Sequence, residues 1–247
     1  MTTTSVERAA AGVGPGGFDA GEAKRRLEAG SSSGAPASRL DGARALLRVL
    51  DVPHLRRIVL AFVVLSAALL VCAFAVGGHP LPVIAAFLAG ALYWSLLEYL
   101  IHRFVLHWEP TVPWQQAIRR RINNHSTHHK KPDRREVYAN PHLVGAVLIG
   151  STMPVIMVAI GFPLPVALAA TSGAFLGYVG TEYLHAALHV LPMKGSAYAR
   201  WLNRFHSIHH YRDDRYNHAV LNPMWDYVFG SAWRPRRARA GSARGDA

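Results

Sequence analysis

Histidines are the residues of this chain whose type and spacing could do chemistry. Fourteen are present among 247 residues, and ten of them fall into four tight groups. Neutral imidazole is the commonest protein ligand for iron, zinc and copper. Ten ligands are too many for one ion and suit two. The pattern therefore predicts a two-metal site with these ligands: His102, His107, His125, His128, His129, His185, His189, His206, His209 and His210.

The spacing within each group favours helices that present several imidazoles on one face. His185 and His189 are four residues apart, and each of the two His-x-x-His-His groups offers positions i, i+3 and i+4. His102 and His107 are five residues apart. They can reach one ion only if the helix loosens between them, and otherwise they serve different ions. The single cysteine, Cys72, excludes a cysteine-based zinc site and any disulfide within the chain.

Four apolar blocks must position these histidines. Each is close to the length of about 20 residues that crosses a bilayer core. The turns Gly77–Pro80 and Gly161–Pro165 join them in pairs. We therefore predict an all-α membrane protein with four transmembrane helices in two hairpins. A soluble bundle of long buried helices is the alternative. The predicted spans are Ile58–Val76, about Leu81–Ile101, Leu143–Phe162 and Val166–Leu184.

Basic residues are segregated along the chain. Residues 1–57 hold nine Lys and Arg, residues 102–142 hold eight and residues 185–247 hold ten, which leaves none for the two hairpin turns. The positive-inside rule then places both termini and the middle loop in the cytoplasm. All four histidine groups lie at or beyond the cytoplasmic ends of the second and fourth spans. We expect a multi-pass integral membrane protein with a cytoplasmic, histidine-rich helical cap.

The net charge of +12 does not indicate a nucleic-acid partner, because no nucleic-acid motif or aromatic interleaving accompanies it. A membrane surface explains the basic residues better. Residues 1–38, rich in Ala, Gly and Ser, are predicted to be a disordered cytoplasmic tail. Residues 39–57 are predicted to be an amphipathic interfacial segment, with a plain extension of the first span as the alternative. Residues 58–232 form the four-span domain with its di-metal cap, and residues 233–247 form a basic disordered tail.

Two carboxylates occupy matching positions near the membrane edge. Glu98 lies one helical turn before His102, and Glu182 lies one turn before His185. A carboxylate at this depth is unfavourable without a partner, so each could orient a ligand histidine. Snorkelling to the interface or pairing with an Arg is an equal alternative. Four residues are thus candidates for a supporting role around the ligands: Glu98, Glu182, His218 and Asp226.

These motifs resemble the membrane fatty acid hydroxylase/sterol desaturase superfamily, and within it most closely the fatty acid 2-hydroxylases. The likeness covers roughly residues 90–232, with the same order, spacing and membrane placement. Five segments carry it: Glu98–Trp108, Asn124–Asp133, Gly177–His189, Lys194–His210 and Trp225–Gly230.

The resemblance implies a non-haem di-iron monooxygenase in which the ten histidines hold two iron ions, with zinc able to occupy the site in purified protein. O2 would be the co-substrate, and hydroxylation would occur at the acyl carbon beside the carbonyl of a fatty acid or sphingolipid-like group. Eukaryotic fusion members of the family carry an N-terminal haem-binding cytochrome domain that serves as the electron donor. Residues 1–57 of this chain are too short for such a domain and are mostly of low complexity. An external ferredoxin-like or cytochrome-like electron donor is therefore expected. Basic residues such as Arg119–Arg121 and Arg134–Arg135 could steer it, although contact with lipid headgroups is the favoured explanation for them.

His218-Ala219 stands where the family usually has an aromatic residue and glycine before its Trp-Asp pair. Carotenoid or sterol hydroxylation and desaturation use the same di-metal chemistry and are alternative functions. The Trp225-Asp226 pair and the His185/His189 pair favour an acyl chain as the substrate. A membrane metal-transport or metal-binding protein is a further alternative. Transporters, however, place ionisable ligands within the spans, whereas here they form a cap.

Overall fold

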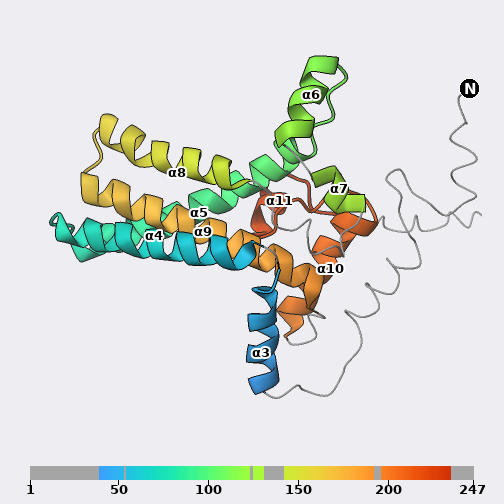
Figure 1. Cartoon of the computed structure of the whole chain (residues 1–247), viewed down its shortest axis with the longest axis horizontal. Helices are drawn as coiled ribbons and strands as arrows, with labels where there is room; N and C mark the ends of the chain where they lie inside the picture. Colours follow the sequence, from blue (N-terminus) through green and yellow to red (C-terminus); the bar gives the residue numbers. More distant parts are fainter. Residues whose placement is uncertain (1–38, 53, 123–124, 131–141, 192–195, 235–247) are drawn as a thin grey trace, which may run out of the picture.

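The computed structural model describes residues 39–52, 54–122, 125–130, 142–191 and 196–234 (Figure 1). This part of the chain is helical, with turns and loops between the helices and no strand. The predicted tails, residues 1–38 and most of 233–247, lie outside the described residues. The elements are α3 Arg39–Val49, α4 Leu55–Ala75, α5 Pro80–Leu100, the π-helix η1 Ile101–Leu106, α6 Pro113–Ile122, α7 His125–Lys130, α8 His142–Ala159, α9 Leu164–Val190, α10 Ala197–Tyr211 and α11 Met224–Val228.

Within the described residues, three helices are long and apolar enough to cross a membrane. They are α4 with 21 residues, α5 continued through η1 with 27 residues, and α9 with 27 residues. The helix α8 stands in the place of the predicted span Leu143–Phe162 and has 18 residues, with Pro154 inside it. The helical fold is therefore as predicted, and the count of four spans stays a prediction.

The helix α9 is the centre of the bundle. It contacts α4, α5 and α8, which run beside it in Figure 1. Small residues allow this close packing. A Cβ at Gly173 would lie 1.9 Å from the carbonyl oxygen of Phe87, and one at Gly90 would lie 1.9 Å from that of Ala170. Within an apolar stretch of 18 residues in each helix, 61% of residues are buried in α9, against 22% in α4 and in α5–η1. The outer helices thus present their apolar side chains outward, as a membrane requires.

The turns between paired helices are short, as predicted. Gly77, with φ +87°, lies between α4 and α5, and Gly161, with φ +97°, lies between α8 and α9. Only glycine adopts such left-handed backbone readily. Both turns lie at one end of the molecule in Figure 1, whereas α7 and the C-terminal end of α10 lie at the other.

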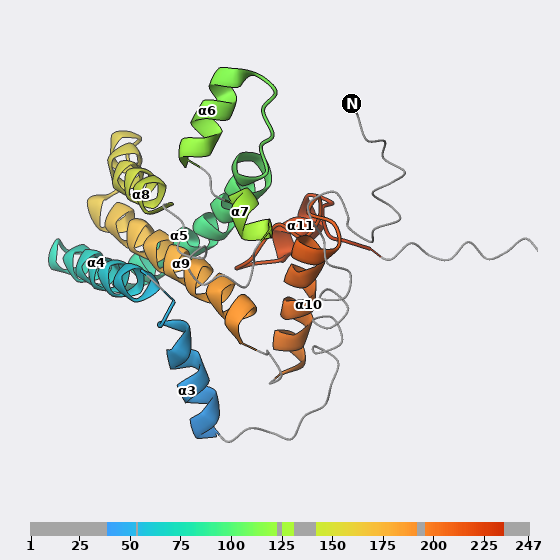
Figure 2. The same cartoon turned by 45° about the vertical axis from the view of Figure 1, so that its right-hand side comes forward.

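The segment 39–57 is not a single element. The helix α3 ends at Val49, and α4 begins at Leu55, three residues before the predicted span. The two helices diverge steeply in Figures 1 and 2. Val49, Val52 and Leu55 are buried against Ala186 and Ala187 of α9, while Leu46 and Leu47 are 51% and 65% exposed. The contact with α9 is thus made by the C-terminal end of α3 and the turn that follows it, whereas Leu46 and Leu47 of α3 stay exposed.

Candidate metal centre

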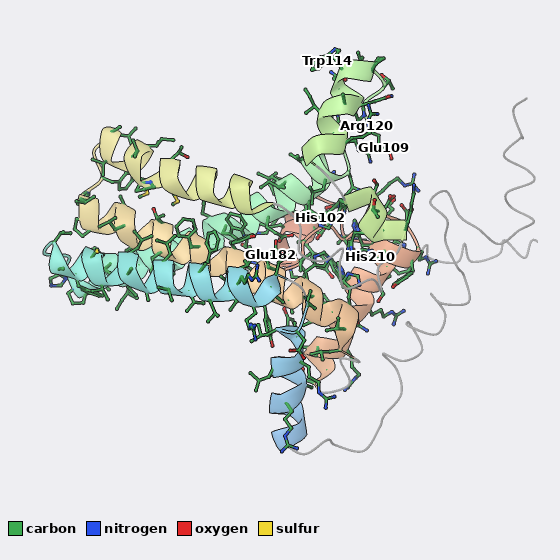
Figure 3. All side chains as sticks on the ribbon, viewed as in Figure 1. His102, Glu109, Trp114, Arg120, Glu182 and His210 are labelled. Atoms are coloured by element: carbon green, nitrogen blue, oxygen red, sulfur yellow. The ribbon has the colours of Figure 1, made fainter. Side chains whose placement is uncertain are left out.

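Four helical segments and one turn deliver the ten clustered histidines to one place. The π-helix η1 carries His102, and His107 follows it directly. The short helix α7 carries three, the end of α9 carries two, and α10 carries three. The helix α9 makes this possible by continuing to Val190, six residues beyond the predicted end of its span. Figure 3 labels His102 and His210 in the region where these elements meet.

One cluster, which we call the five-histidine group, consists of His102, His107, His125, His129 and His209. Their candidate ligand nitrogens all lie within 4.8 Å of one another. The Nε2 atom of His125 lies 2.9 Å from that of His102 and 3.1 Å from that of His107. Residues more than 100 positions apart also meet, because His107 Nε2 and His209 Nε2 are 3.1 Å apart.

The second cluster, the four-histidine group, consists of His128, His185, His189 and His210, with ligand nitrogens again within 4.8 Å. His206 adjoins it, since its Nε2 atom lies 3.0 Å from that of His189. The two groups touch: the rings of His129 and His210 stack with centroids 4.3 Å apart. The structure thus brings all ten predicted residues together, in two adjacent sets.

The π-helix explains how His102 and His107 join one group. The His107 N–H donates to the carbonyl of His102, five residues earlier, at 3.3 Å. This wider turn returns position i+5 to the face of position i, whereas a regular α-helix would not. The loosened helix is one of the two possibilities that their spacing leaves open, and it is the one the structure adopts.

The second ring nitrogen of two ligand candidates is held by backbone. His209 Nδ1 donates to the carbonyl oxygen of Tyr216 at 2.7 Å, and His102 Nδ1 donates to that of His218. A proton fixed on Nδ1 leaves the Nε2 lone pair for a metal ion. The loop after α10 therefore sets the tautomer and the orientation of two members of the five-histidine group.

Two buried carboxylates hold this loop in place. Asp226 accepts the N–H groups of His218 and Ala219 at 2.9 and 2.8 Å, and also the hydroxyl of Ser231 at 2.8 Å. Glu98 accepts the N–H of Val220 at 3.2 Å and makes a longer contact with that of Leu221. Backbone N–H groups buried this deeply need an acceptor, and these carboxylates supply it.

The supporting residues therefore act differently from the expectation. Glu98 binds the loop rather than His102, because the Nδ1 atom of His102 is already engaged by the His218 carbonyl. His218 contributes through its backbone, and Asp226 through the loop. Glu182 is buried and makes no hydrogen bond or ion pair with another residue of the described part. Sequence reasoning missed Tyr216 and Ser231, and no motif marks them, because the contacts are made by a backbone carbonyl and a lone hydroxyl.

The electrostatics favour neutral imidazoles. Burial lowers the pKa of His107 to about 4. Burial and neighbouring imidazoles lower the pKa of the other clustered histidines on α7 and α10 well below the usual range: His125, His128, His129, His206, His209 and His210. A neutral imidazole is the form that binds a metal.

The donor set fits metal ions. Zinc and similar ions bind imidazole nitrogen at about 2.0–2.1 Å, so adjacent ligands of one ion lie about 3 Å apart. The neighbouring Nε2 atoms lie 2.9–3.1 Å apart. Both ring nitrogens of His210 are buried and lack a hydrogen-bond partner among the described residues. A buried polar atom without a partner is unfavourable, and a bound ion at Nε2 removes part of that penalty.

The class that this fold and site define is a bundle of helices apolar enough to cross a membrane, which ends in two adjacent histidine clusters that could each hold a metal ion. The family model for fatty acid hydroxylases matches residues 87–231, which is more than half of the chain and includes all ten histidines. The chain belongs to the fatty acid hydroxylase family.

Individual relatives agree. Human fatty acid 2-hydroxylase is 34% identical over 146 residues, which are 58% of this chain and 38% of that protein. The ceramide very long chain fatty acid hydroxylase of Schizosaccharomyces pombe is 32% identical over 64% of this chain and 45% of its own length. This chain thus spans less than half of either relative. The solved hydroxylase domain of scs7p has the same fold, with a TM-score of 0.62 and 24% identity over 73% of this chain and 67% of that one.

Proposed function

We propose that this chain is an O2-dependent di-iron lipid hydroxylase that adds a hydroxyl group at the 2-position of a fatty acid or a sphingolipid-like acyl group. The observation that carries the proposal is the pair of touching imidazole clusters at the ends of apolar, membrane-type helices. The names of the relatives, which specify fatty acid 2-hydroxylation and hydroxylation of ceramide fatty acids, support the acyl substrate and the position.

Each cluster has a role in this proposal. The five-histidine group would hold one iron ion, and the four-histidine group with His206 would hold the other. When bound, the iron ions supply the oxidant that an unactivated C–H bond requires. The chain keeps its imidazoles neutral through burial, fixes His102 and His209 by backbone carbonyls, and excludes water from the centre, where His209 is 0% and His128 is 2% exposed.

The position of the site suits the second carbon of an acyl chain. That carbon is adjacent to the polar end of the lipid, so an enzyme that oxidises it needs its centre at the membrane edge rather than at mid-depth. The histidines begin where the apolar runs of α5 and α9 give way to polar sequence. The acyl tail would then extend back along the bilayer.

The proposal includes a membrane arrangement and a source of electrons. The chain would cross the bilayer four times, with the centre and both termini in the cytoplasm. Hydroxylation consumes one O2, two electrons and two protons, and releases one water. A ferredoxin-like or cytochrome-like protein would supply the electrons one at a time.

Lipid mass spectrometry of cells that express the chain tests this function. We expect one added oxygen on acyl chains, located at the 2-position. In the His128→Ala variant the product should fall at least about 100-fold, because a ligand is lost. His79→Ala, which changes an exposed histidine in the α4–α5 turn, is the matched control and should keep the product.

The possible outcomes separate the alternatives. Oxygen on a carotenoid or sterol ring would overturn the acyl assignment and keep the metal chemistry. No oxygenated lipid from iron-loaded protein with a reductant would overturn the hydroxylase itself.

A further inference from the structure

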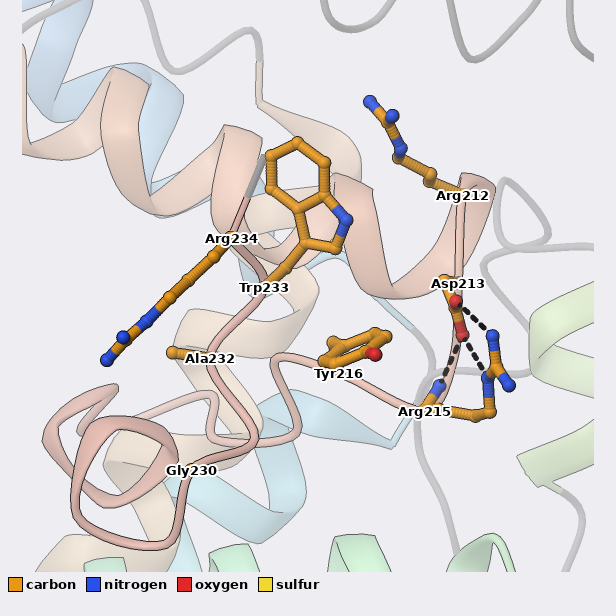
Figure 4. Close-up of a pocket in the computed structure, with 8 residues that line it drawn as sticks. All are labelled: Arg212, Asp213, Arg215, Tyr216, Gly230, Ala232, Trp233 and Arg234. Atoms are coloured by element: carbon orange, nitrogen blue, oxygen red, sulfur yellow. Dashed lines mark hydrogen bonds and ion pairs between the residues drawn. The ribbon is translucent and has the colours of Figure 1, made fainter. Parts of the chain in front are cut away.

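The surface behind the five-histidine group contains a cavity of about 1060 Å³ that the metal centre does not use (Figure 4). We call it the arginine cavity. The loop after α10 and the segment 230–234 form its walls, and its charged lining consists of Arg212, Asp213, Arg215 and Arg234. The three arginines are exposed.

Positive charge in the arginine cavity is only partly compensated. Arg215 forms an ion pair with Asp213, with nitrogen–oxygen distances of 2.8 and 2.7 Å. Arg212 instead stacks over the Trp233 ring, 4.3 Å from its centroid. Neither Arg212 nor Arg234 forms an ion pair among the described residues. The hydrogen bond from Arg215 lowers the pKa of Asp213, and Arg212 only adds to this effect. The cavity therefore favours an anionic ligand or an acidic surface.

The walls of the arginine cavity are linked to the candidate metal ligands by single hydrogen bonds. Tyr216 lines the cavity, and its carbonyl accepts from His209. The next residue, Asn217, accepts the N–H of Trp233 at 2.7 Å, and its own N–H donates to Ser231. The carbonyl of His218 accepts from His102. One peptide segment thus separates the cavity from two imidazoles of the five-histidine group.

The location of the cavity favours a protein over a lipid headgroup as its partner. It lies beside the C-terminal end of α10, which Figure 1 shows with α7 at the end of the molecule opposite the helix turns. By contrast, α6, which carries Arg119 and Arg120, projects to the side in Figures 1 and 3. Because electron transfer slows steeply with distance, a redox partner gains most by docking where one peptide segment separates it from a ligand.

We propose that the arginine cavity is the docking site of an acidic one-electron redox protein of the ferredoxin class, and that electrons reach the five-histidine group through Tyr216 and His209. The inference rests on the proposed function, which creates the need for electrons. Two reduced partners each lose one electron per turnover. With two protons, these electrons convert one oxygen atom of O2 to water, and the other atom enters the C–H bond.

Anaerobic stopped-flow reduction tests this proposal. Iron-loaded full-length protein is mixed with a prereduced, acidic plant-type [2Fe–2S] ferredoxin as the probe. The second-order rate constant for iron reduction is divided by that for photoreduced deazariboflavin, a small uncharged reductant. At low salt, this ratio should fall at least about ten-fold in Arg212→Glu and in Arg234→Glu, because both reverse the charge that attracts the ferredoxin. The loss should shrink as salt screens the charges.

The matched control is Arg204→Glu, which makes the same charge change on an exposed residue of α10 outside the cavity. We expect its ratio to stay within about two-fold of the parent protein, since Arg204 does not line the cavity and its Coulomb interaction with a ferredoxin docked there acts over a longer distance. An equal loss in Arg204→Glu, or no loss in the cavity variants, would overturn the docking site. The docking site would also be overturned if anionic phospholipid vesicles or inorganic phosphate occupied the arginine cavity and left the rate of reduction by ferredoxin unchanged.

The reduction assay tests the docking site alone, because it needs no acyl substrate and no O2. A separate hydroxylation assay, with deazariboflavin as the reductant and with O2 and an acyl lipid present, tests the proposed function. If deazariboflavin and O2 support no acyl hydroxylation while the cavity variants still lose ferredoxin reduction, the proposed function fails and the docking site stands. If hydroxylation proceeds and the cavity variants reduce normally, the docking site fails alone.

Discussion

At the scale of single residues, Asp226 holds the loop after α10 in place. Its two carboxylate oxygens accept two backbone N–H groups and one hydroxyl, and it is 0% exposed. Tyr99 extends the network, with its hydroxyl 2.8 Å from Ser231. The loop that Asp226 holds places the carbonyls of Tyr216 and His218 against two imidazoles. Asp226 is therefore a positioning residue that acts through backbone.

Replacing this carboxylate tests that role. In Asp226→Asn the side-chain amide nitrogen must face one of the buried N–H groups, which leaves that group unpaired at about 1–3 kcal/mol. We expect metal affinity of the five-histidine group to fall about 10–100-fold, as for other residues that orient ligands. Cobalt titration followed by absorption measures it without any substrate.

The matched control is Asp213→Asn, in the same loop, whose carboxylate accepts hydrogen bonds from the exposed Arg215. Its metal affinity should match that of the parent protein. If Asp226→Asn bound cobalt as tightly as Asp213→Asn, the loop carbonyls would not be orienting the ligands.

At the scale of elements, the register between α5 and α9 decides whether the histidines meet. The helix η1 continues α5 and brings His102, while α9 brings His185 and His189. Gly90 and Gly173 fix the approach, because each leaves no room for a side-chain carbon against the facing backbone. A change in this spacing would move two sets of ligands relative to each other.

A single methyl group at this contact should therefore be disruptive. In Gly173→Ala the new Cβ would meet the Phe87 carbonyl oxygen at 1.9 Å, and backbone cannot move aside as a side chain can. Overpacking of this kind costs about 1–3 kcal/mol, so thermal unfolding in detergent should begin at a lower temperature.

Gly180→Ala is the control on the same helix. Its nearest neighbour is the flexible side chain of Leu221, at 3.2 Å. Equal melting of the two variants would show that the α5–α9 contact is looser than the structure has it.

Features that depend on the local spacing of residues could be predicted from the sequence. Hydrogen bonds to backbone groups far away in the chain could not. All ten clustered histidines, the short glycine turns and the possibility of a loosened helix at His102 follow from residue types and intervals. The partners of Glu98 do not, since the N–H groups it binds lie about 120 positions away. The helical spacing of Glu182, His185 and His189 also predicted a helix here, although the apolar run, which ends at Leu184, could not show where that helix ends. The arginine cavity joins segments whose separate sequences carry no motif.

At the scale of the whole molecule, the two ends of the bundle differ in charge and in chemistry. The glycine turns, which hold no Lys or Arg, lie at one end, and the histidine clusters with the arginine cavity lie at the other. If the positive-inside rule holds, the metal centre faces the compartment that contains soluble redox proteins. The docking proposal therefore depends on the topology.

Labelling of introduced cysteines tests the topology. In a Cys72→Ser background, His79→Cys and Phe162→Cys place a thiol in each hairpin turn, and Arg204→Cys places one on α10, all at exposed positions. A membrane-impermeant maleimide should label both turns in intact cells and should reach α10 only after permeabilisation.

Labelling of the two turns tests the number of spans, and labelling of α10 tests which side of the membrane the metal centre faces. Four spans with a cytoplasmic cap require the α4–α5 and α8–α9 turns to share one side, opposite α10. If Phe162→Cys were protected while His79→Cys was labelled, the α8–α9 hairpin would not cross the bilayer, and the count of four spans would be wrong. If Arg204→Cys were labelled in intact cells, the metal centre would face outward. A cytoplasmic redox protein could not then reach the arginine cavity, whatever its charge.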